Sequence, residues 1–184
     1  MRTKSELREW AREWRGRQDS SGASDFAHFI GHPFLEAARR VAGYLSLPDE
    51  ISPFPLMGHC HARGKVVAVS AWDDESKAYR FCRWVPDAPL EVGPKRIPQP
   101  VEKRWMSASD FDLFLVPGLA FGRRGERLGF GAVIYDRLLS SASPRARFVG
   151  VAHDWQLVDA IPQESHDVCM HCILTPTQTH SILI

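Results

Sequence analysis

The chain has 184 residues, of which 44% are hydrophobic and 24% charged, and its formal net charge is +1. This length suits one domain over residues 1–184, and the composition is that of an ordinary globular protein. The charge excludes a global field that would attract nucleic acid or an acidic membrane, and the short apolar runs exclude a bilayer span. The charged N-terminus predicts no secretory signal, and four unevenly placed cysteines favour reduced thiols in a cytoplasmic protein.

An amphipathic helix is predicted from Thr3 to Arg17, because four apolar residues recur at helical spacing. These residues are Leu7, Trp10, Ala11 and Trp14. Lys4 and Arg8 are four residues apart, so they lie on one face of this helix. From periodicity alone, the pair is most simply a solvated basic face.

A second helix is predicted from Pro33 to Leu45, because proline suits a first helical turn and an apolar stripe follows it. Prolines then keep the segment 46–57 from forming a regular helix throughout. The apolar segments 65–72 and 79–84 are predicted to be strands.

The most informative stretch runs from Asp112 to Leu139. Its apolar run 113–116 predicts a parallel strand covered on both faces, and a helical pattern resumes near Tyr135. Between them, the segment 122–131 is a loop rich in glycine and arginine. Such a loop before a helix binds anions, because glycines let backbone amides approach and arginine offers forked donors that match phosphate. A solvated turn is the alternative that composition leaves open.

Two further strands are predicted, over 147–152 and 168–174. Histidines and cysteines cluster near the second strand and in an earlier segment, which raises the hypothesis of a metal site. They are His166, Cys169, His171 and Cys172, together with His59, Cys60 and His61. In a strand, Cys169 and Cys172 would point to opposite faces, so we expect the cysteines to be small buried apolar residues.

Residues 116–137, VPGLAFGRRGERLGFGAVIYDR, resemble the hallmark of the 5-formyltetrahydrofolate cyclo-ligases (methenyltetrahydrofolate synthetases), which is roughly VPGLAFDxxGxRLGxGGGYYDR. A weaker similarity covers the rest of the chain, including K-x-x-L-R at Lys4 to Arg8. The resemblance implies an α/β fold with three α/β/α layers and a mostly parallel central sheet, of the NagB/RpiA/CoA-transferase-like type.

The resemblance also implies an ATP-dependent ligase that cyclises 5-formyltetrahydrofolate to 5,10-methenyltetrahydrofolate and releases ADP and phosphate. Transfer of the γ-phosphoryl group to the formyl oxygen makes that oxygen a good leaving group, and N10 then closes the ring. The implied cofactors are ATP and Mg²⁺, the implied partners are these small molecules, and we expect a monomer.

The same resemblance implies the site residues. The ATP site is expected to comprise Lys4, Arg8, Arg124, Gly125, Arg127, Leu128, Gly129, Phe130, Gly131, Tyr135 and Asp136. Of these, Arg127, Tyr135 and Asp136 are expected to act in catalysis, with Asp136 also binding Mg²⁺. Glu50 and Trp84 are expected to contact the folate, the alternatives being a surface glutamate and a core tryptophan.

Some positions depart from the family pattern. The segment Ala132-Val133-Ile134 stands where the family has Gly-Gly-Tyr, and valine poorly tolerates the positive φ that glycine permits. Ser70 replaces the proline of the usual V-A-L-P. A relative that binds folate or nucleotide without turnover is therefore the alternative hypothesis.

Overall fold

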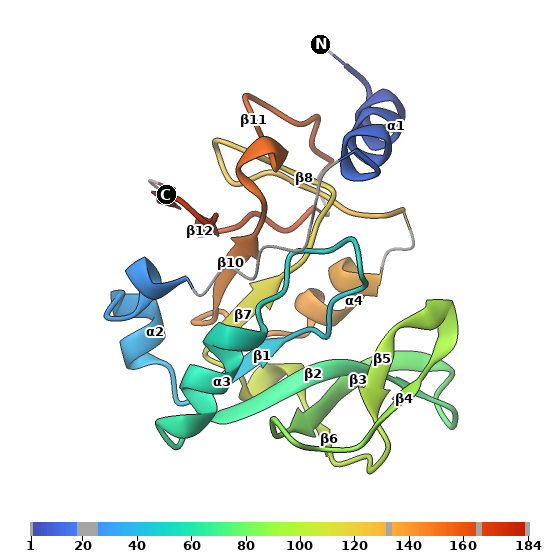
Figure 1. Cartoon of the computed structure of the whole chain (residues 1–184), viewed down its shortest axis with the longest axis vertical. Coiled ribbons are helices and arrows are strands. Elements are labelled where there is room, and N and C mark those ends of the chain that lie inside the picture. Colours follow the sequence, from blue (N-terminus) through green and yellow to red (C-terminus); the bar gives the residue numbers. More distant parts are fainter. Residues whose placement is uncertain (1, 18–25, 132–133, 165–166, 183–184) are drawn as a thin grey trace.

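The structure is a computed structural model that describes residues 2–17, 26–131, 134–164 and 167–182. Its centre is an eight-stranded sheet in the order β13-β12-β10-β7-β1-β2-β3-β6 (Figure 1). The strands from β12 to β2 pair in parallel, whereas β13, β3 and β6 pair antiparallel at the two edges. The strand bounds are β1 Arg40–Gly43, β2 Val66–Asp73, β3 Ala78–Trp84, β6 Trp105–Met106, β7 Leu113–Val116, β10 Arg147–Val151, β12 Cys172–Leu174 and β13 Thr179–Ser181.

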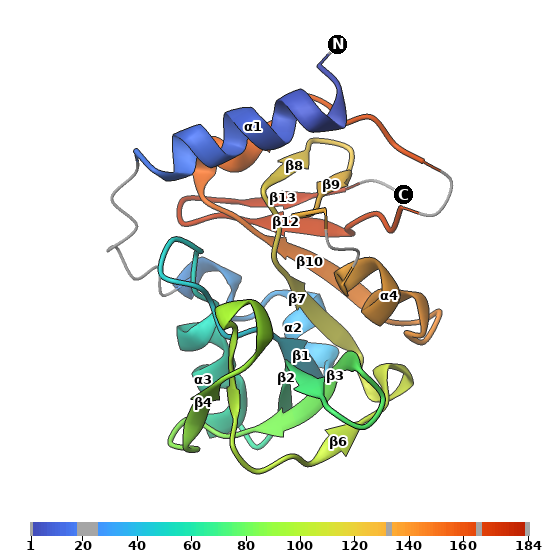
Figure 2. The same cartoon turned by 90° about the vertical axis from the view of Figure 1, so that its right-hand side faces the viewer.

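Helices cover both faces of this sheet (Figure 2). On one face α2 (Pro33–Ala37) and α3 (Phe54–Ala62) share a hydrophobic cluster with Leu113 and Leu115 of β7. On the other, α4 (Ile134–Ser140) packs in the cluster that contains Phe114 and Val116. Successive side chains of β7 thus enter opposite cores, as the alternation of a strand requires. The predicted three-layer α/β/α fold with a mostly parallel sheet is confirmed.

A smaller unit covers one end of the molecule. Helix α1 (Lys4–Arg15) begins at a capping box made by Thr3 and Glu6, and lies across a three-stranded sheet (Figure 2). That sheet consists of β8 Ala120–Gly122, β9 Arg127–Leu128 and β11 Leu157–Val158. Leu7 and Ala11 of α1 pack against Leu128 of β9. Burial of this apolar stripe holds α1 on the small sheet.

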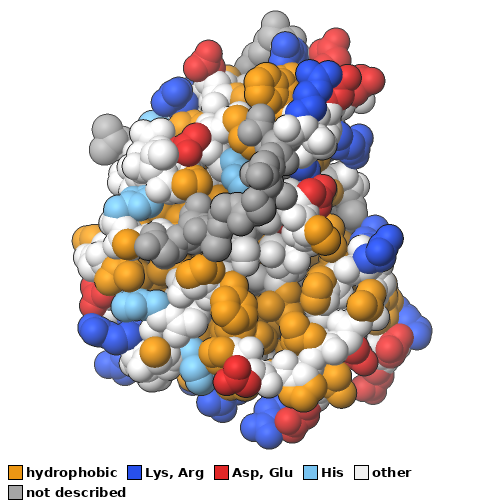
Figure 3. Space-filling view, in the orientation of Figure 1, with side chains coloured by type: hydrophobic (Ala, Val, Ile, Leu, Met, Phe, Trp, Pro, Cys, Tyr) orange, Lys and Arg blue, Asp and Glu red, His pale blue; other side chains and the backbone are white. Residues whose placement is uncertain are grey.

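A two-stranded arm extends from the opposite end. It consists of β4 (Leu90–Val92) and β5 (Pro98–Pro100), with the 3₁₀ turn η2 (Pro94–Arg96) at its tip. Leu90 and Val92 of the arm and Phe54 of α3 are exposed hydrophobic residues. Figure 3 shows hydrophobic side chains gathered between α3 and the arm. The other 3₁₀ turns are η1 Ala27–Phe29, η3 Ala108–Asp110 and η4 Asp154–Gln156.

Two sequence predictions were wrong. The helix from Pro33 to Leu45 ends at Ala37, and β1 follows, because an apolar run buried on both sides fits a strand as well as a helix. The loop 122–131 is confirmed for most of its length, although Gly122 ends β8 and the short strand β9 interrupts the loop at Arg127 and Leu128. The strand 168–174 contains only β12, since Met170 N donates instead to Gly125 O at 2.8 Å.

The remaining predicted elements are confirmed with small shifts of their ends. The first helix spans Lys4–Arg15, and the predicted strands correspond to β2, β3, β7 and β10. No helix in the described part of the chain is long and apolar enough to cross a bilayer.

Candidate active site

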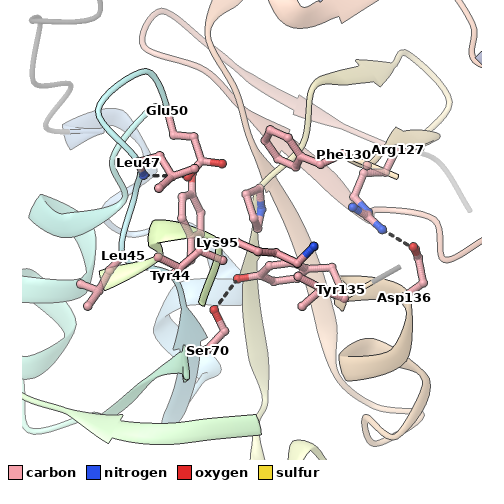
Figure 4. A pocket seen from close by; sticks show the side chains of 14 residues that line it. Tyr44, Leu45, Leu47, Glu50, Ser70, Lys95, Arg127, Phe130, Tyr135 and Asp136 are labelled. Atoms are coloured by element: carbon pink, nitrogen blue, oxygen red, sulfur yellow. Dashed lines mark hydrogen bonds and ion pairs between the residues drawn. The ribbon is translucent and has the colours of Figure 1, made fainter. Parts of the chain in front are cut away.

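A cavity of about 240 Å³ opens at the carboxyl ends of the parallel strands (Figure 4). Tyr44 follows β1, Ser70 lies in β2 just beyond the end of β1, and Pro117 follows β7. This edge is where open α/β sheets place ligands. The other lining residues are Leu45, Leu47, Glu50, Lys95, Ile97, Arg127, Gly129, Phe130, Ile134, Tyr135 and Asp136.

Arg127 and Asp136 form an ion pair in this cavity (Figure 4). Arg127 comes from β9, and Asp136 lies in the first turn of α4. The Arg127 side chain is 4% exposed, and its Nε has no hydrogen-bond partner among the described residues. A buried guanidinium with a free N–H donor is well suited to bind an anion, because arginine offers several N–H groups in one plane.

Gly129 lets the chain pass close to this guanidinium. A methyl group at Gly129 would lie 2.9 Å from Arg127 Nη1, closer than real Cβ contacts. Gly131 has φ +92°, a conformation that residues with a side chain rarely adopt. The two glycines therefore serve different needs, one the packing of Arg127 and the other the path of the backbone.

Tyr135 presents its hydroxyl group to the cavity, 3.3 Å from Ser70 Oγ (Figure 4). Burial raises the pKa of Tyr135 above its ordinary value, although the hydrogen bond with Ser70 acts in the opposite direction. The phenol therefore stays protonated, and it can donate to an oxygen in the cavity.

Glu50 lies on the wall across the cavity from Arg127 (Figure 4). Its Oε2 accepts from Leu47 N at 2.9 Å, and its Oε1 lies 3.5 Å from Arg15 Nη2. Burial raises the pKa of the Glu50 carboxyl, and the hydrogen bond from Leu47 and the charge of Arg15 partly oppose this effect. A carboxylate held in this way can accept N–H donors of a ligand ring.

Helix α1 packs on the β8–β9 hairpin and contacts the loop next to the cavity. Arg8 Nε donates to Gly129 O at 3.2 Å, which links the helix to the loop that carries Gly129. Lys4 Nζ is 2.9 Å from Glu164 and 2.7 Å from Asp167. Burial lowers the pKa of Lys4, but the hydrogen bonds to Asp167 and Glu164 outweigh it and raise that pKa overall.

A family model described as the 5-formyltetrahydrofolate cyclo-ligase family matches residues 2–176. The chain belongs to this family. A structure of the Aquifex aeolicus 5,10-methenyltetrahydrofolate synthetase has the same fold, with a TM-score of 0.81, 27% identity, and coverage of 98% of this chain and 93% of that chain.

Curated relatives agree with this assignment. The 5-formyltetrahydrofolate cyclo-ligase of Escherichia coli K12 is 28% identical over 166 residues, which are 88% of this chain and 91% of that protein. The one from Mycolicibacterium smegmatis is 44% identical over 89 residues, which are 47% of this chain and 44% of that protein.

The cavity brings together six of the residues that the family resemblance predicted. They are Glu50, Arg127, Gly129, Phe130, Tyr135 and Asp136. Sequence reasoning missed other lining residues, including Tyr44, Ser70 and Lys95. Ser70 carried a signal, because it replaces a family proline, whereas nothing in the pattern around Lys95 marks that residue.

Other predicted residues lie elsewhere. Lys4 and Arg8 border the hairpin and do not line the cavity. Arg124 bonds to Glu126 on the β8–β9 turn, and a methyl group at Gly125 would lie 2.5 Å from Met170 O. Leu128 is 1% exposed and packs under α1, and Gly131 is not among the residues that line the cavity.

Trp84 belongs to the core. It is 1% exposed, and its ring meets Phe54 edge-on with the centroids 5.4 Å apart. The structure therefore supports the core role that the sequence left open for Trp84, since the ring does not line the cavity.

Two groups of sequence observations concern residues outside the described ranges. Ala132 and Val133, two of the substituted positions, and His166 lie there. Within the described ranges, no group of three or more His, Cys, Asp or Glu residues is arranged to hold a metal ion. Cys169 is exposed, whereas Cys172 is buried, and burial raises the pKa of the Cys172 thiol to about 12.

Proposed function

We propose that this chain catalyses the ATP-dependent cyclisation of 5-formyltetrahydrofolate to 5,10-methenyltetrahydrofolate. Its membership of the cyclo-ligase family supports this reaction. The observation that carries the proposal for the site is the Arg127 guanidinium, which is buried in the cavity and whose Nε has no hydrogen-bond partner in the part of the chain that the structure describes. A phosphate oxygen is the partner that suits this donor best.

The reaction needs activation of a formyl group, whose oxygen is a poor leaving group. The formyl oxygen attacks the γ-phosphorus of ATP, and the bond to the bridging oxygen breaks to release ADP. N10 then attacks the formyl carbon and loses its proton, and the C–O bond breaks to release phosphate. Atoms and charges balance, and the protein has to hold the reactants in line and neutralise phosphate charge.

The cavity residues supply these functions. Arg127 binds the transferring phosphoryl group through the donors that its pair with Asp136 leaves free. The protonated Tyr135 hydroxyl donates to a phosphoryl or formyl oxygen. Glu50, on the opposite wall, accepts N–H groups of the pterin ring and so directs the formyl group toward Arg127. Each of these contacts orients a reactant or offsets charge in the transition state.

Asp136 is suited to bind the magnesium ion of an ATP–Mg²⁺ complex. Mg²⁺ is held in such sites by one or two carboxylates together with the phosphates of the nucleotide. Asp136 is one carboxylate of this kind at the edge of the cavity, and when bound the ion would offset phosphate charge. Lys4 and Arg8 lie on the adjoining helix face, where they complement the outer phosphates once Lys4 exchanges its carboxylate partners for them.

The chain is proposed to act as one domain and as a monomer in the cytoplasm. Its near-neutral net charge suits small-molecule substrates. Light scattering of the purified protein, with and without ATP, tests the monomer.

The test of the reaction is an absorbance assay for the methenyl product, with 5-formyltetrahydrofolate, Mg²⁺ and ATP. Growth of the product band only when ATP is present, with ADP and phosphate formed in equal amounts, supports the ligase. Thermal stabilisation by either ligand without product would instead identify a binding protein without turnover. ATP hydrolysis that does not depend on the folate would contradict both.

A further inference from the structure

A second, larger cavity adjoins the first. Its volume is about 670 Å³, and it lies between α4 and the antiparallel edge formed by β3 and β6. Lys95 and Ile134 line both cavities, so the two meet at these residues. The aromatic residues Trp72, Tyr79 and Trp105 form part of its wall.

The charge on this second cavity is predominantly positive. Four cations line it, Lys77, Arg80, Lys95 and Arg137, against the single carboxylate of Asp110. Arg80 is neutralised by a hydrogen-bonded pair with Asp73 at 2.9 Å, Lys77 lies 3.5 Å from Asp74, and Asp110 lies 3.6 Å from Arg40. Lys95 and Arg137 make no ion pair with any described residue. An anionic ligand therefore finds two uncompensated cations.

The wall between the cavities is held in place by the arm. Tyr79 donates its hydroxyl hydrogen to Pro94 O at 2.9 Å, and Trp72 N donates to Gln99 Oε1 at 2.8 Å. These bonds tie the turn η2 and strand β5 to β2 and β3. Lys95 itself has φ +56°, an uncommon conformation for a residue with a side chain. The turn thus places Lys95, a cation without an ion pair to the described residues, at the junction of the two cavities.

We propose that the second cavity binds the glutamate tail of the folate substrate, with Arg137 as a carboxylate ligand and Lys95 at the junction. This inference rests on the proposed function, because it concerns the same substrate. 5-Formyltetrahydrofolate ends in a glutamate that carries two carboxylates, and the uncompensated charge of the cavity complements them.

The sizes of the cavities support this assignment. Pockets that enclose a drug-sized ligand measure roughly 300–1,000 Å³, whereas the first cavity measures about 240 Å³. A pterin, a benzoyl group and a glutamate need more room than that. Glu50 lines the first of these two cavities and not the second, so a pterin bound to Glu50 leaves the rest of the folate to pass Lys95 and Ile134.

The second cavity also has aromatic residues in its wall, which suit the benzoyl group that links the pterin to the glutamate. Trp105 lies beneath the Arg80 guanidinium, which is 5.1 Å from its ring centroid, and Trp72 meets Tyr79 edge-on. Arg137 follows Asp136 directly in α4, so the tail site and the phosphate site are linked through one helical turn. Substrate orientation and phosphate binding therefore depend on the same short helix.

The test compares two substrates, 5-formyltetrahydrofolate and 5-formyltetrahydropteroate, which lacks the glutamate. In Arg137→Ala the KM for the full folate should rise about fivefold, the size of one partly exposed charge pair. The KM for the pteroate and the KM for ATP should not change. Arg137→Lys should restore much of the affinity for the full folate, and Arg137→Glu should weaken it further.

The matched control is Arg63→Ala, which removes an exposed arginine just after α3, outside both cavities. Its KM values for both folates should equal those of the wild type. An equal rise for the pteroate and the full folate in Arg137→Ala, or no rise for either, would overturn the tail site. A rise in the KM for ATP alone would assign the cavity to the nucleotide. Absence of turnover in the wild type would instead contradict the proposed function.

Discussion

Arg15 and Glu50 face each other across the gap between α1 and the segment before α3, with Arg15 Nη2 3.5 Å from Glu50 Oε1. Arg15 Nε also donates to Asp49 O at 2.6 Å, and the guanidinium carbon lies 5.0 Å from the centroid of the Phe130 ring. Glu50 and Phe130 line different walls of the first cavity. Arg15 therefore fixes the distance between these walls without lining the cavity itself.

Substitution of Arg15 by alanine is expected to weaken folate binding more than it slows chemistry. Loss of the guanidinium frees both the Glu50 segment and the Phe130 ring, so the KM for 5-formyltetrahydrofolate should rise about tenfold with a smaller change in kcat. Arg15→Lys should recover part of the loss, because it keeps the charge but not the planar stack. Steady-state kinetics with each substrate varied measures this effect.

The control for that experiment is Arg12→Ala on the exposed side of the same helix. It also removes an arginine from α1, but one that is exposed, whereas Arg15 is the arginine that contacts Glu50 and Phe130. A KM for the folate that rises equally in both variants would show that the stability of α1, and not the bridge made by Arg15, determines binding.

Glu50→Gln tests the effect of burial on the Glu50 carboxyl. Because burial raises the pKa of Glu50 above its ordinary value of 4.5, the native state binds more protons than the unfolded state between the two pKa values. The contribution of Glu50 to stability is therefore full below pH 4.5 and is lost as the pH rises through the native pKa. Glutamine does not ionise, so the Tm of the variant relative to the wild type should increase from acid to neutral pH.

Thermal melts across that pH range measure the difference, with Glu36→Gln at an exposed glutamate of α2 as the control. A difference that stays constant with pH, or that decreases, contradicts the assignment. The same variant should lose folate affinity, because one oxygen of the carboxylate is replaced by an NH₂ group, which cannot accept from the N–H groups of the pterin.

The fold could be predicted where the sequence pattern and the burial agree. Leu113 to Val116 are apolar without interruption, and β7 is buried on both faces as expected. The prediction failed at Val41 and Ala42, because a short strand buried between two neighbours has no alternation to distinguish it from a helix. It also failed after His166, where Met170 bonds to the hairpin, a partner that local sequence does not reveal.

The site was predictable only as far as the family motif extends. Arg127, Tyr135 and Asp136 lie in one continuous stretch, and the fold brings them into one cavity. Tyr44 and Lys95 come from a strand end and from an arm, and only the tertiary pairing of these elements brings them to the site. Trp84 shows the converse case, because a motif position suggested a ligand contact at a residue that the core buries.

Arg127→Ala and Asp136→Ala are each expected to lower kcat/KM at least ~100-fold without unfolding the protein, since each removes a charge that acts in the transition state. The double variant should lose little more than the worse single variant, because the two side chains act as one ion pair. Kinetics and thermal melts of all three variants measure this. Near wild-type rates in either single variant would remove the assigned role of that residue.

Gly129→Ala tests whether the exact position of the Arg127 guanidinium matters, because this variant keeps Arg127 but displaces its side chain. The added methyl group would lie 2.9 Å from Arg127 Nη1, and that nitrogen cannot retreat freely because the guanidinium is paired with Asp136. We expect kcat/KM to fall about tenfold or more, because a small displacement of a charged group costs much of its effect on the transition state. The Tm should change little, since the backbone of this glycine is not strained.

The control is Gly58→Ala in α3, where an added methyl group meets nothing within 4 Å. Alanine has a higher helix propensity than glycine, so this variant should be more stable by up to about 1 kcal/mol and retain full activity. A loss of activity in Gly129→Ala that is accompanied by a large fall in Tm would indicate general destabilisation of the protein and not a displaced guanidinium. An unchanged rate would show that the guanidinium can be displaced without effect, and phosphate binding would then have to depend on other cations of the site.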